Sequence, residues 1–243
     1  GDGNFDIEVG VDPDYEALEM KVGSYINAEG KVVRDAADAV GIVFKMEAIG
    51  SDVPANYPVA LQGKTIAGYA VAIENVATGR QVLNNAAMSS LVTTDATVTN
   101  GTQATDALLT GIGEVAFMTT YNSWVNEHPL DGESLSSWYI PTVDQLGEFM
   151  GMLFKIGEVE PTGGQAFREM PEFAFENGVM FDRDPIESVY YASCTVNGSK
   201  DISGVIINVD KTTKQVLDAK ASSLKVTGSS QKALCRPMIT IFK

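Results

Sequence analysis

The chain has 243 residues, of which 44% are hydrophobic and 20% charged, and 32 acidic against 17 basic side chains give it a net charge of -15. This composition allows a well-filled core, whereas the excess of negative charge excludes nucleic acid as a partner, because phosphates are bound by clustered Lys and Arg. No apolar run approaches the about 18 residues that cross a bilayer, so we expect no transmembrane segment.

Histidine and cysteine are too rare for most metal and nucleophile chemistry. The chain has a single histidine, His128, so multi-histidine metal sites are excluded. His128 precedes Pro129 and is expected to be a loop residue. Cys194 and Cys235 have the spacing of neither a zinc ribbon nor a redox CxxC motif. They are either two free buried thiols or a disulfide between neighbouring strands. We therefore predict no catalytic residue, no metal site and no cofactor.

The first half of the chain predicts an extension followed by strands and helical pieces. We expect residues 1–38 to form an N-terminal extension with short strands and residues 39–243 to form the main domain. Residues 40–49 are almost continuously apolar, which is typical of a strand covered on both faces. Residues 64–76 predict a strand antiparallel to it. Apolar residues at helical spacing between residues 104 and 127 predict one or two helical pieces.

The strongest local pattern is the sequence WYIPTVDQL at residues 138–146. Thr142 followed three residues later by Gln145 is a capping box, in which each side chain accepts a hydrogen bond from the other residue's backbone. Pro141 fixes the approach of the chain to this cap. Apolar residues then recur at three- and four-residue steps up to Gly157, so we predict that a helix begins here and ends near that glycine.

The last part of the chain predicts a long loop and then a meander of strands. Residues 158–186 are rich in proline, glycine and acidic residues with little periodicity, and loops of this length are uncommon unless they carry function or lack order. Residues 187–243 predict a β-meander with turns at Asn197-Gly198 and at Gly228.

Three short motifs stand in an order that is typical of one protein family. They are WYIP at residues 138–141 with Leu146, YYAS at residues 190–193, and CRPM at residues 235–238. These motifs resemble the WYLPS with ExL, YWSS and VRPV motifs of bacterial C-type-lectin-like domains of the collagen-like-adhesin C-terminal type, which are abundant in surface lipoproteins of Bacteroidales. The resemblance covers about residues 38–243. Tyr191 stands where the family has Trp, and Ala192 intrudes before the serine, so the packing of this strand can differ from the family's.

The resemblance implies an α+β, C-type-lectin-like fold in which two helices pack on a mainly antiparallel twisted sheet with long loops. It assigns a structural role to Trp138, Tyr139, Pro141, Thr142, Tyr191, Arg236 and Pro237. The two aromatic residues at the start of this series can anchor the helix start by burying large side chains. Arg236 is expected to meet an acidic partner from the loop region.

The function that the resemblance implies is non-catalytic adhesion or ligand binding outside a bacterial cell. The expected partner is a glycan or a surface or host protein, and the expected location is secreted or on the outer cell surface, with a lipid anchor ahead of residue 1. The alternative is a structural subunit of a fimbria or other surface assembly, in which residues 1–38 pair as strands with a neighbour.

The ligand-binding face is expected along the loop of residues 158–186 and its border. The residues predicted to contact a ligand are Phe181, Asp182, Arg183, Asp184 and Tyr190. The chain lacks the Glu-Pro-Asn or Gln-Pro-Asp loop and the Trp-Asn-Asp strand of calcium-dependent lectins, so we expect weak or absent calcium dependence.

Overall fold

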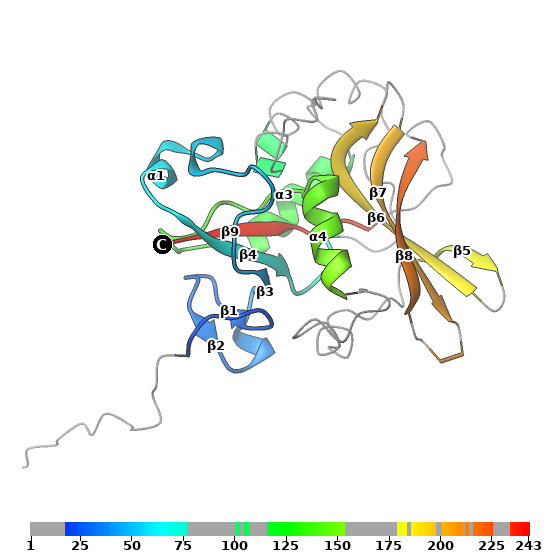
Figure 1. Cartoon of the computed structure of the whole chain (residues 1–243), viewed down its shortest axis with the longest axis horizontal. Helices are drawn as coiled ribbons and strands as arrows, with labels where there is room; N and C mark the ends of the chain where they lie inside the picture. Colours follow the sequence, from blue (N-terminus) through cyan, green and yellow to red (C-terminus); the bar gives the residue numbers. More distant parts are fainter. Residues whose placement is uncertain are drawn as a thin grey trace, which may run out of the picture.

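The computed structural model describes residues 18–76, 101–102, 105–106, 116–153, 179–183, 186–197, 201–210, 212–213, 216–225 and 234–243. These residues form an α+β structure with two antiparallel sheets and few helices (Figure 1). Within these residues, helices are too short or too polar to cross a membrane.

The first sheet has five strands in the order β2-β1-β3-β4-β9, and every neighbouring pair is antiparallel. The strands are β1 Tyr25–Ile26, β2 Val32–Val33, β3 Gly41–Lys45, β4 Ile66–Ala72 and β9 Met238–Phe242. The strands predicted at residues 40–49 and 64–76 are confirmed as β3 and β4. The short strands expected before residue 39 are also present, and β1 pairs with β3, so they belong to this sheet.

Both faces of the first sheet are buried because its strands carry apolar side chains on both sides. Along β3, Ile42 and Phe44 enter one apolar cluster while Val43 enters another. On β4 the same alternation places Val71 with Ile42 and Ala70 with Val43. This arrangement confirms the interpretation of residues 40–49 as a strand covered on both faces.

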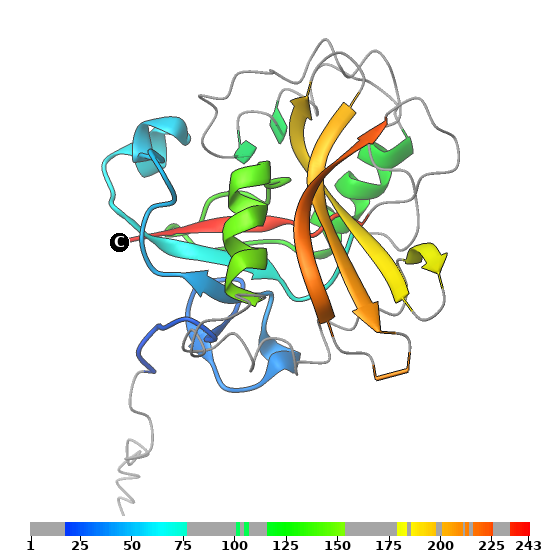
Figure 2. The ribbon, with the colours of Figure 1, turned by 45° about the vertical axis from the view of Figure 1, so that its right-hand side comes forward.

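Two helices supply apolar side chains to the two faces of this sheet. Helix α3, Ala116–Glu127, contributes Tyr121 and Trp124 to the cluster that contains Val43. Helix α4, Val143–Leu153, contributes Leu146 and Phe149 to the opposite cluster. Figures 1 and 2 show α4 crossing in front of β4 and β9. The shorter elements are η1 Ala36–Asp38, η2 Pro54–Asn56 and α1 Val59–Gln62.

The second sheet has four strands in chain order, β5 Val179–Arg183, β6 Ile186–Asn197, β7 Asp201–Asp210 and β8 Val216–Lys225. Helix α4 contacts β6, β7 and β8 as well as β3, so it lies between the two sheets (Figure 2). Helix α4, which begins at the capping box, therefore packs against both sheets.

Two sequence-based expectations about the strands need correction. Residues 179–183 were expected in the irregular loop, but they form β5, which pairs with β6. The predicted meander holds for β6, β7 and β8, whereas β9 leaves it and pairs with β4 in the first sheet. The physical reason is burial: all five residues of β9 are buried, and this requires a position covered on both faces.

Candidate functional site

The WYIP segment is a backbone joint between the two sheets. The amide of Tyr139 donates to the carbonyl oxygen of Met238 at 3.0 Å, and the amide of Met238 donates back at 2.9 Å. At the other end of the segment, the amide of Cys194 on β6 donates to the carbonyl oxygen of Pro141 at 2.9 Å. The segment thus connects β9 of the first sheet with β6 of the second. Trp138 and Tyr139 are buried, as a structural role requires.

The predicted capping box at the start of α4 is confirmed in both directions. The amide of Gln145 donates to Oγ1 of Thr142 at 3.2 Å, and the amide of Thr142 donates to Oε1 of Gln145 at 3.0 Å. The amide of Val143 donates to Oγ1 of Thr195 on β6 at 3.1 Å, which satisfies a further orphan amide of the first turn. The cap therefore orients α4 against the second sheet.

Gln145 also begins a chain of buried side-chain hydrogen bonds that crosses the interior. Its Nε2 donates to the hydroxyl of Tyr139 at 3.1 Å, and that hydroxyl lies 3.0 Å from Oγ1 of Thr240. Thr240 lies 2.8 Å from the hydroxyl of Tyr57, which donates to Oδ2 of Asp52. We call these five residues the buried hydroxyl chain. It links the start of α4 to the loop between β3 and β4.

Asp52 is the acceptor at the end of the buried hydroxyl chain and is 3% exposed. Its Oδ2 accepts a second hydroxyl, from Tyr69 at 2.6 Å, and its Oδ1 accepts from Nδ2 of Asn56 at 3.0 Å. Burial raises the pKa of Tyr57 and of Tyr69 above the ordinary value, so both hydroxyls keep the protons that they donate. Sequence reasoning missed Asp52, because nothing in its local pattern distinguishes it from an exposed turn residue.

The two cysteines are free and buried within one apolar cluster. Burial raises the pKa of the Cys194 thiol to about 12, and burial together with the neighbouring Cys194 raises the pKa of Cys235 further. Of the two alternatives that the sequence left open, the structure has the free thiols. Because the thiolate is the reactive form, neither cysteine is poised as a nucleophile.

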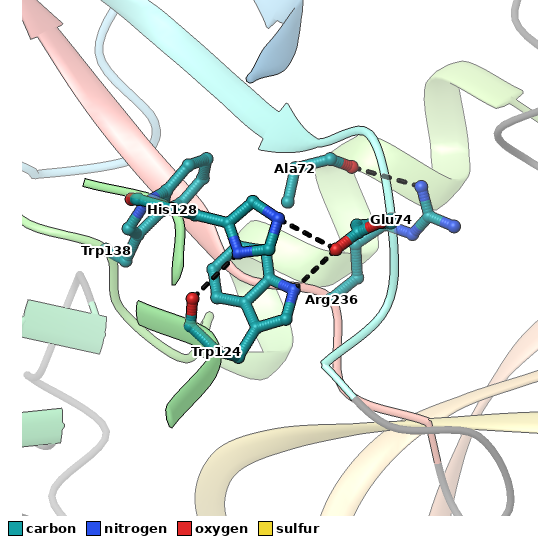
Figure 3. A network of polar contacts seen from close by, with 6 residues as sticks. All are labelled: Ala72, Glu74, Trp124, His128, Trp138 and Arg236. Atoms are coloured by element: carbon teal, nitrogen blue, oxygen red, sulfur yellow. Dashed lines mark hydrogen bonds and ion pairs between the residues drawn. The ribbon is translucent and has the colours of Figure 1, made fainter. Parts of the chain in front are cut away.

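A second polar arrangement, the tryptophan–histidine cluster, consists of Glu74, Trp124, His128 and Trp138 (Figure 3). The ring of His128 stacks on Trp124 with centroids 4.2 Å apart and an angle of 18° between the planes. Nε2 of His128 lies 2.8 Å from Oε1 of Glu74, and Nε1 of Trp124 donates to the same oxygen at 3.0 Å. Nε1 of Trp138 donates to the carbonyl oxygen of His128 at 2.8 Å.

His128 follows the last residue of α3 and precedes Pro129, where the sequence predicted a loop residue. Its ring contacts were not predicted, because Glu74 is far away in the sequence. Only the spatial meeting of the end of β4 with the end of α3 brings them together (Figure 3).

Arg236 is 2% exposed and lies against the end of β4. Its Nε donates to Oδ1 of Asn75 at 3.1 Å. Its Nη1 donates to the carbonyl oxygen of Ala72 at 3.0 Å (Figure 3). These contacts attach it to the first sheet. The acidic partner expected from the loop region stays a prediction, because most of that region lies outside the described residues. The carbonyl oxygen of Pro237 accepts from the amide of Ala72, so both motif residues align β9 beside β4.

Comparisons with protein-family models, with curated proteins and with solved structures found no match. In the part of the chain that the structure describes, no group of three or more His, Cys, Asp or Glu side chains is placed to hold a metal ion.

Four of the five residues predicted to contact a ligand lie in two adjacent strands. Phe181, Asp182 and Arg183 lie in β5, and their partners in β6 are Ser188, Glu187 and Ile186 respectively. Asp184 lies outside the described residues, as does most of the loop of residues 158–186.

Tyr190 lies further along β6, and its side chain is fully buried. It belongs to the same apolar cluster as Ala192 and Cys194, whereas Tyr191 is buried in the opposite cluster. A ligand could reach Tyr190 only if the core opened. The structure therefore gives Tyr190 and Tyr191 the same kind of role, which is packing.

Proposed function

We propose that the chain is a non-catalytic, extracellular adhesion or ligand-binding domain of a bacterial surface lipoprotein, with a C-type-lectin-like fold. One observation carries the proposal: the three motifs behind the resemblance meet at one joint. The WYIP segment is hydrogen-bonded to Met238 of the CRPM motif and to Cys194, which directly follows the YYAS motif. Motifs far apart in the sequence that build one joint support a shared fold, and function follows from it by analogy.

Among the described residues, His128, Asp52 and Cys194 are engaged in structural contacts, which supports a non-catalytic role. Both ring nitrogens of His128 lie within hydrogen-bond distance of protein acceptors. The carboxylate of Asp52 accepts from two tyrosine hydroxyls, and the thiol of Cys194 is buried with a raised pKa. A general base or a nucleophile needs a free lone pair that reaches a substrate.

The recognition face that we propose is the segment of residues 158–186, which includes β5. Strand β5 is an edge strand of the second sheet, at the opposite edge from β8. Phe181, Asp182 and Arg183 on this strand, with Asp184 after it, combine an aromatic ring with both signs of charge. Such a set is suited to a glycan or a protein surface, where rings stack and charged groups donate or accept hydrogen bonds.

The fimbrial alternative depends on residues 1–38 pairing with a neighbouring subunit. Within the described part of this segment, β1 already pairs with both β2 and β3, and the outer edge of the sheet is the two-residue strand β2. A two-residue edge offers few backbone groups for strand addition. This observation favours the binding domain over the structural subunit.

An array of glycans and host matrix proteins, probed with the natural chain, tests the proposal. The variant D182A/R183A removes one acidic and one basic side chain from β5, and D218A/K220A removes the same pair of charges from β8. We expect binding of an array ligand to weaken at least about tenfold in the first variant and to persist in the second. Circular dichroism of both variants controls for folding.

Two results would overturn this proposal. Equal loss of binding in both variants would place the recognition face elsewhere. Turnover of any array ligand that disappears in H128Q would contradict the non-catalytic role.

A further inference from the structure

His128 presents both of its ring nitrogens to groups that accept hydrogen bonds. Nδ1 lies 2.7 Å from the carbonyl oxygen of Trp124, and Nε2 lies 2.8 Å from a carboxylate oxygen of Glu74. A carbonyl oxygen has no proton to give, and an ionised carboxylate is acceptor-only. Neutral imidazole has a single N–H and can satisfy one of these contacts, whereas imidazolium has two and satisfies both.

We propose that His128 and Glu74 form a proton-operated latch, closed when His128 is an imidazolium and open when its ring is neutral. In the closed state the ring donates from Nδ1 to Trp124 and from Nε2 to Glu74. Loss of one proton sets a bare ring nitrogen against an oxygen lone pair at one of the two contacts. That contact then lengthens or breaks, and the link between α3 and the end of β4 is released.

The surroundings of the ring accommodate a positive charge. Glu74 faces it from the segment after β4, while Glu127, the last residue of α3, and Asp131, in the loop that follows, are exposed acidic neighbours in the chain. Arg236, ahead of β9, is a basic group near this cluster, and its guanidinium donates to Ala72 (Figure 3) and to Asn75. The stacked face of Trp124 adds the negative ring quadrupole that attracts a cation.

The latch is positioned to affect more than one element. Glu74 also accepts from Nε1 of Trp124, and the carbonyl oxygen of His128 accepts from Nε1 of Trp138, directly before the WYIP joint. The two indoles pack edge to face with centroids 5.1 Å apart. Opening therefore loosens the contact of the α3 end with both the first sheet and the joint that carries the motif.

The composition of the chain makes the latch unusually easy to observe. The chain contains one histidine and two tryptophans, and all three belong to the tryptophan–histidine cluster. Nitrogen-15 NMR of the natural chain therefore reports the protonation of His128 without ambiguity. We expect two protected ring N–H signals at about pH 5.5 and at most one at about pH 8.

Tryptophan fluorescence follows the opening itself, because Trp124 and Trp138 are 5% and 4% exposed in the closed state. We expect the emission of the natural chain to shift to longer wavelength as the pH rises from about 5.5 to about 8, and the urea midpoint to fall. The closed state has two hydrogen bonds to the ring where the open state has one, so opening weakens the attachment of α3 to the end of β4.

Three variants separate the latch from a general effect of pH. H128Q removes the titrating ring and E74Q removes the charge that faces it, so both should lose the pH dependence of emission and midpoint. E127Q removes an equal charge from the exposed neighbour of His128 and should behave as the natural chain. A single ring N–H at about pH 5.5, or equal pH dependence in H128Q and the natural chain, would refute the latch.

Discussion

A buried carboxylate is stable only where donors surround it, and Asp52 shows how this chain supplies them. Two tyrosine hydroxyls and one amide converge on its two oxygens. These donors come from η2, from the residue after it, and from β4. The residue therefore fixes the loop of residues 46–65 over the first sheet.

Replacing Asp52 by alanine should be among the most destabilising single changes in the chain. D52A leaves the hydroxyls of Tyr57 and Tyr69 and the amide of Asn56 without this acceptor, and each such loss is costly in a buried site. We expect the free energy of unfolding, measured by urea denaturation, to fall by about 3 kcal/mol.

The exposed Asp131 provides the control for this change, because D131A removes the same carboxylate from the surface. We expect D131A to change the free energy of unfolding by less than about 0.5 kcal/mol. If the two variants are equally stable, Asp52 does not have the structural role that its contacts indicate.

At the scale of elements, the start of α4 combines a capping box, which is visible in the local sequence, with hydrogen bonds to residues that are distant in the sequence. The capping box itself involves residues three apart, but its glutamine also accepts from the amide of Gly101 and donates to Tyr139. Because Thr142 and Gln145 are both buried in the folded chain, water does not compete for these hydrogen bonds. The helix start therefore depends on more than the cap alone.

Removing the two cap side chains separately should show this difference. T142A should lower the free energy of unfolding by about 1 kcal/mol, because one first-turn amide loses its side-chain acceptor. Q145A should lower the free energy of unfolding clearly more, because the side-chain amide of Gln145 forms hydrogen bonds with the amides of Gly101 and Thr142 and with the hydroxyl of Tyr139. Urea denaturation measures both, and T142S, which keeps the hydroxyl, should remain close to the natural chain. Equal losses in T142A and Q145A would contradict the wider role of Gln145.

The strands show where local pattern stops being informative. β3 and β4 were predictable because continuous apolar runs indicate strands with two buried faces, and β6, β7 and β8 because a turn signal separates strand-like runs. The position of β9 was not, because a strand pattern does not specify its neighbour, and β9 pairs with β4 rather than with β8. Strand β5 was hidden by the acidic residues that surround it.

At the scale of the whole molecule, buried hydroxyls and thiols make the free energy of unfolding depend on pH in the alkaline range. Burial raises the pKa of Tyr57, Tyr69, Tyr121 and Tyr139, and it raises that of Cys194 to about 12. In the unfolded chain these groups titrate at their ordinary values, about 8.5 for thiols and about 10 for phenols. Above these values the unfolded state binds fewer protons than the folded state, so stability falls as the pH rises.

We therefore expect the free energy of unfolding to decrease progressively above about pH 9, as measured by urea denaturation at increasing pH. Y121F removes one buried phenol and should make this decrease less steep. A stability that is constant up to about pH 11 would show that these groups are not protected from titration in the folded chain.

The sequence predicted those parts of the candidate site whose contacts join residues close together in the chain. Thr142 and Gln145 were predictable because the cap operates within one helical turn. The packing role of Trp138, Tyr139 and Arg236 came from the motifs, yet the partners of Arg236 at the end of β4 did not. The contact between His128 and Glu74 lacks a local signal, because it arises only where α3 ends beside β4.

The sequence by itself determined the features whose physics is local: the cap that starts α4 and the doubly covered strands β3 and β4. The tertiary structure alone decided which strands pair, where Asp52 finds its donors and why His128 faces two acceptors. The reason is that apolar periodicity specifies which face of an element is buried but not which element covers it. That choice depends on how all the faces pack together.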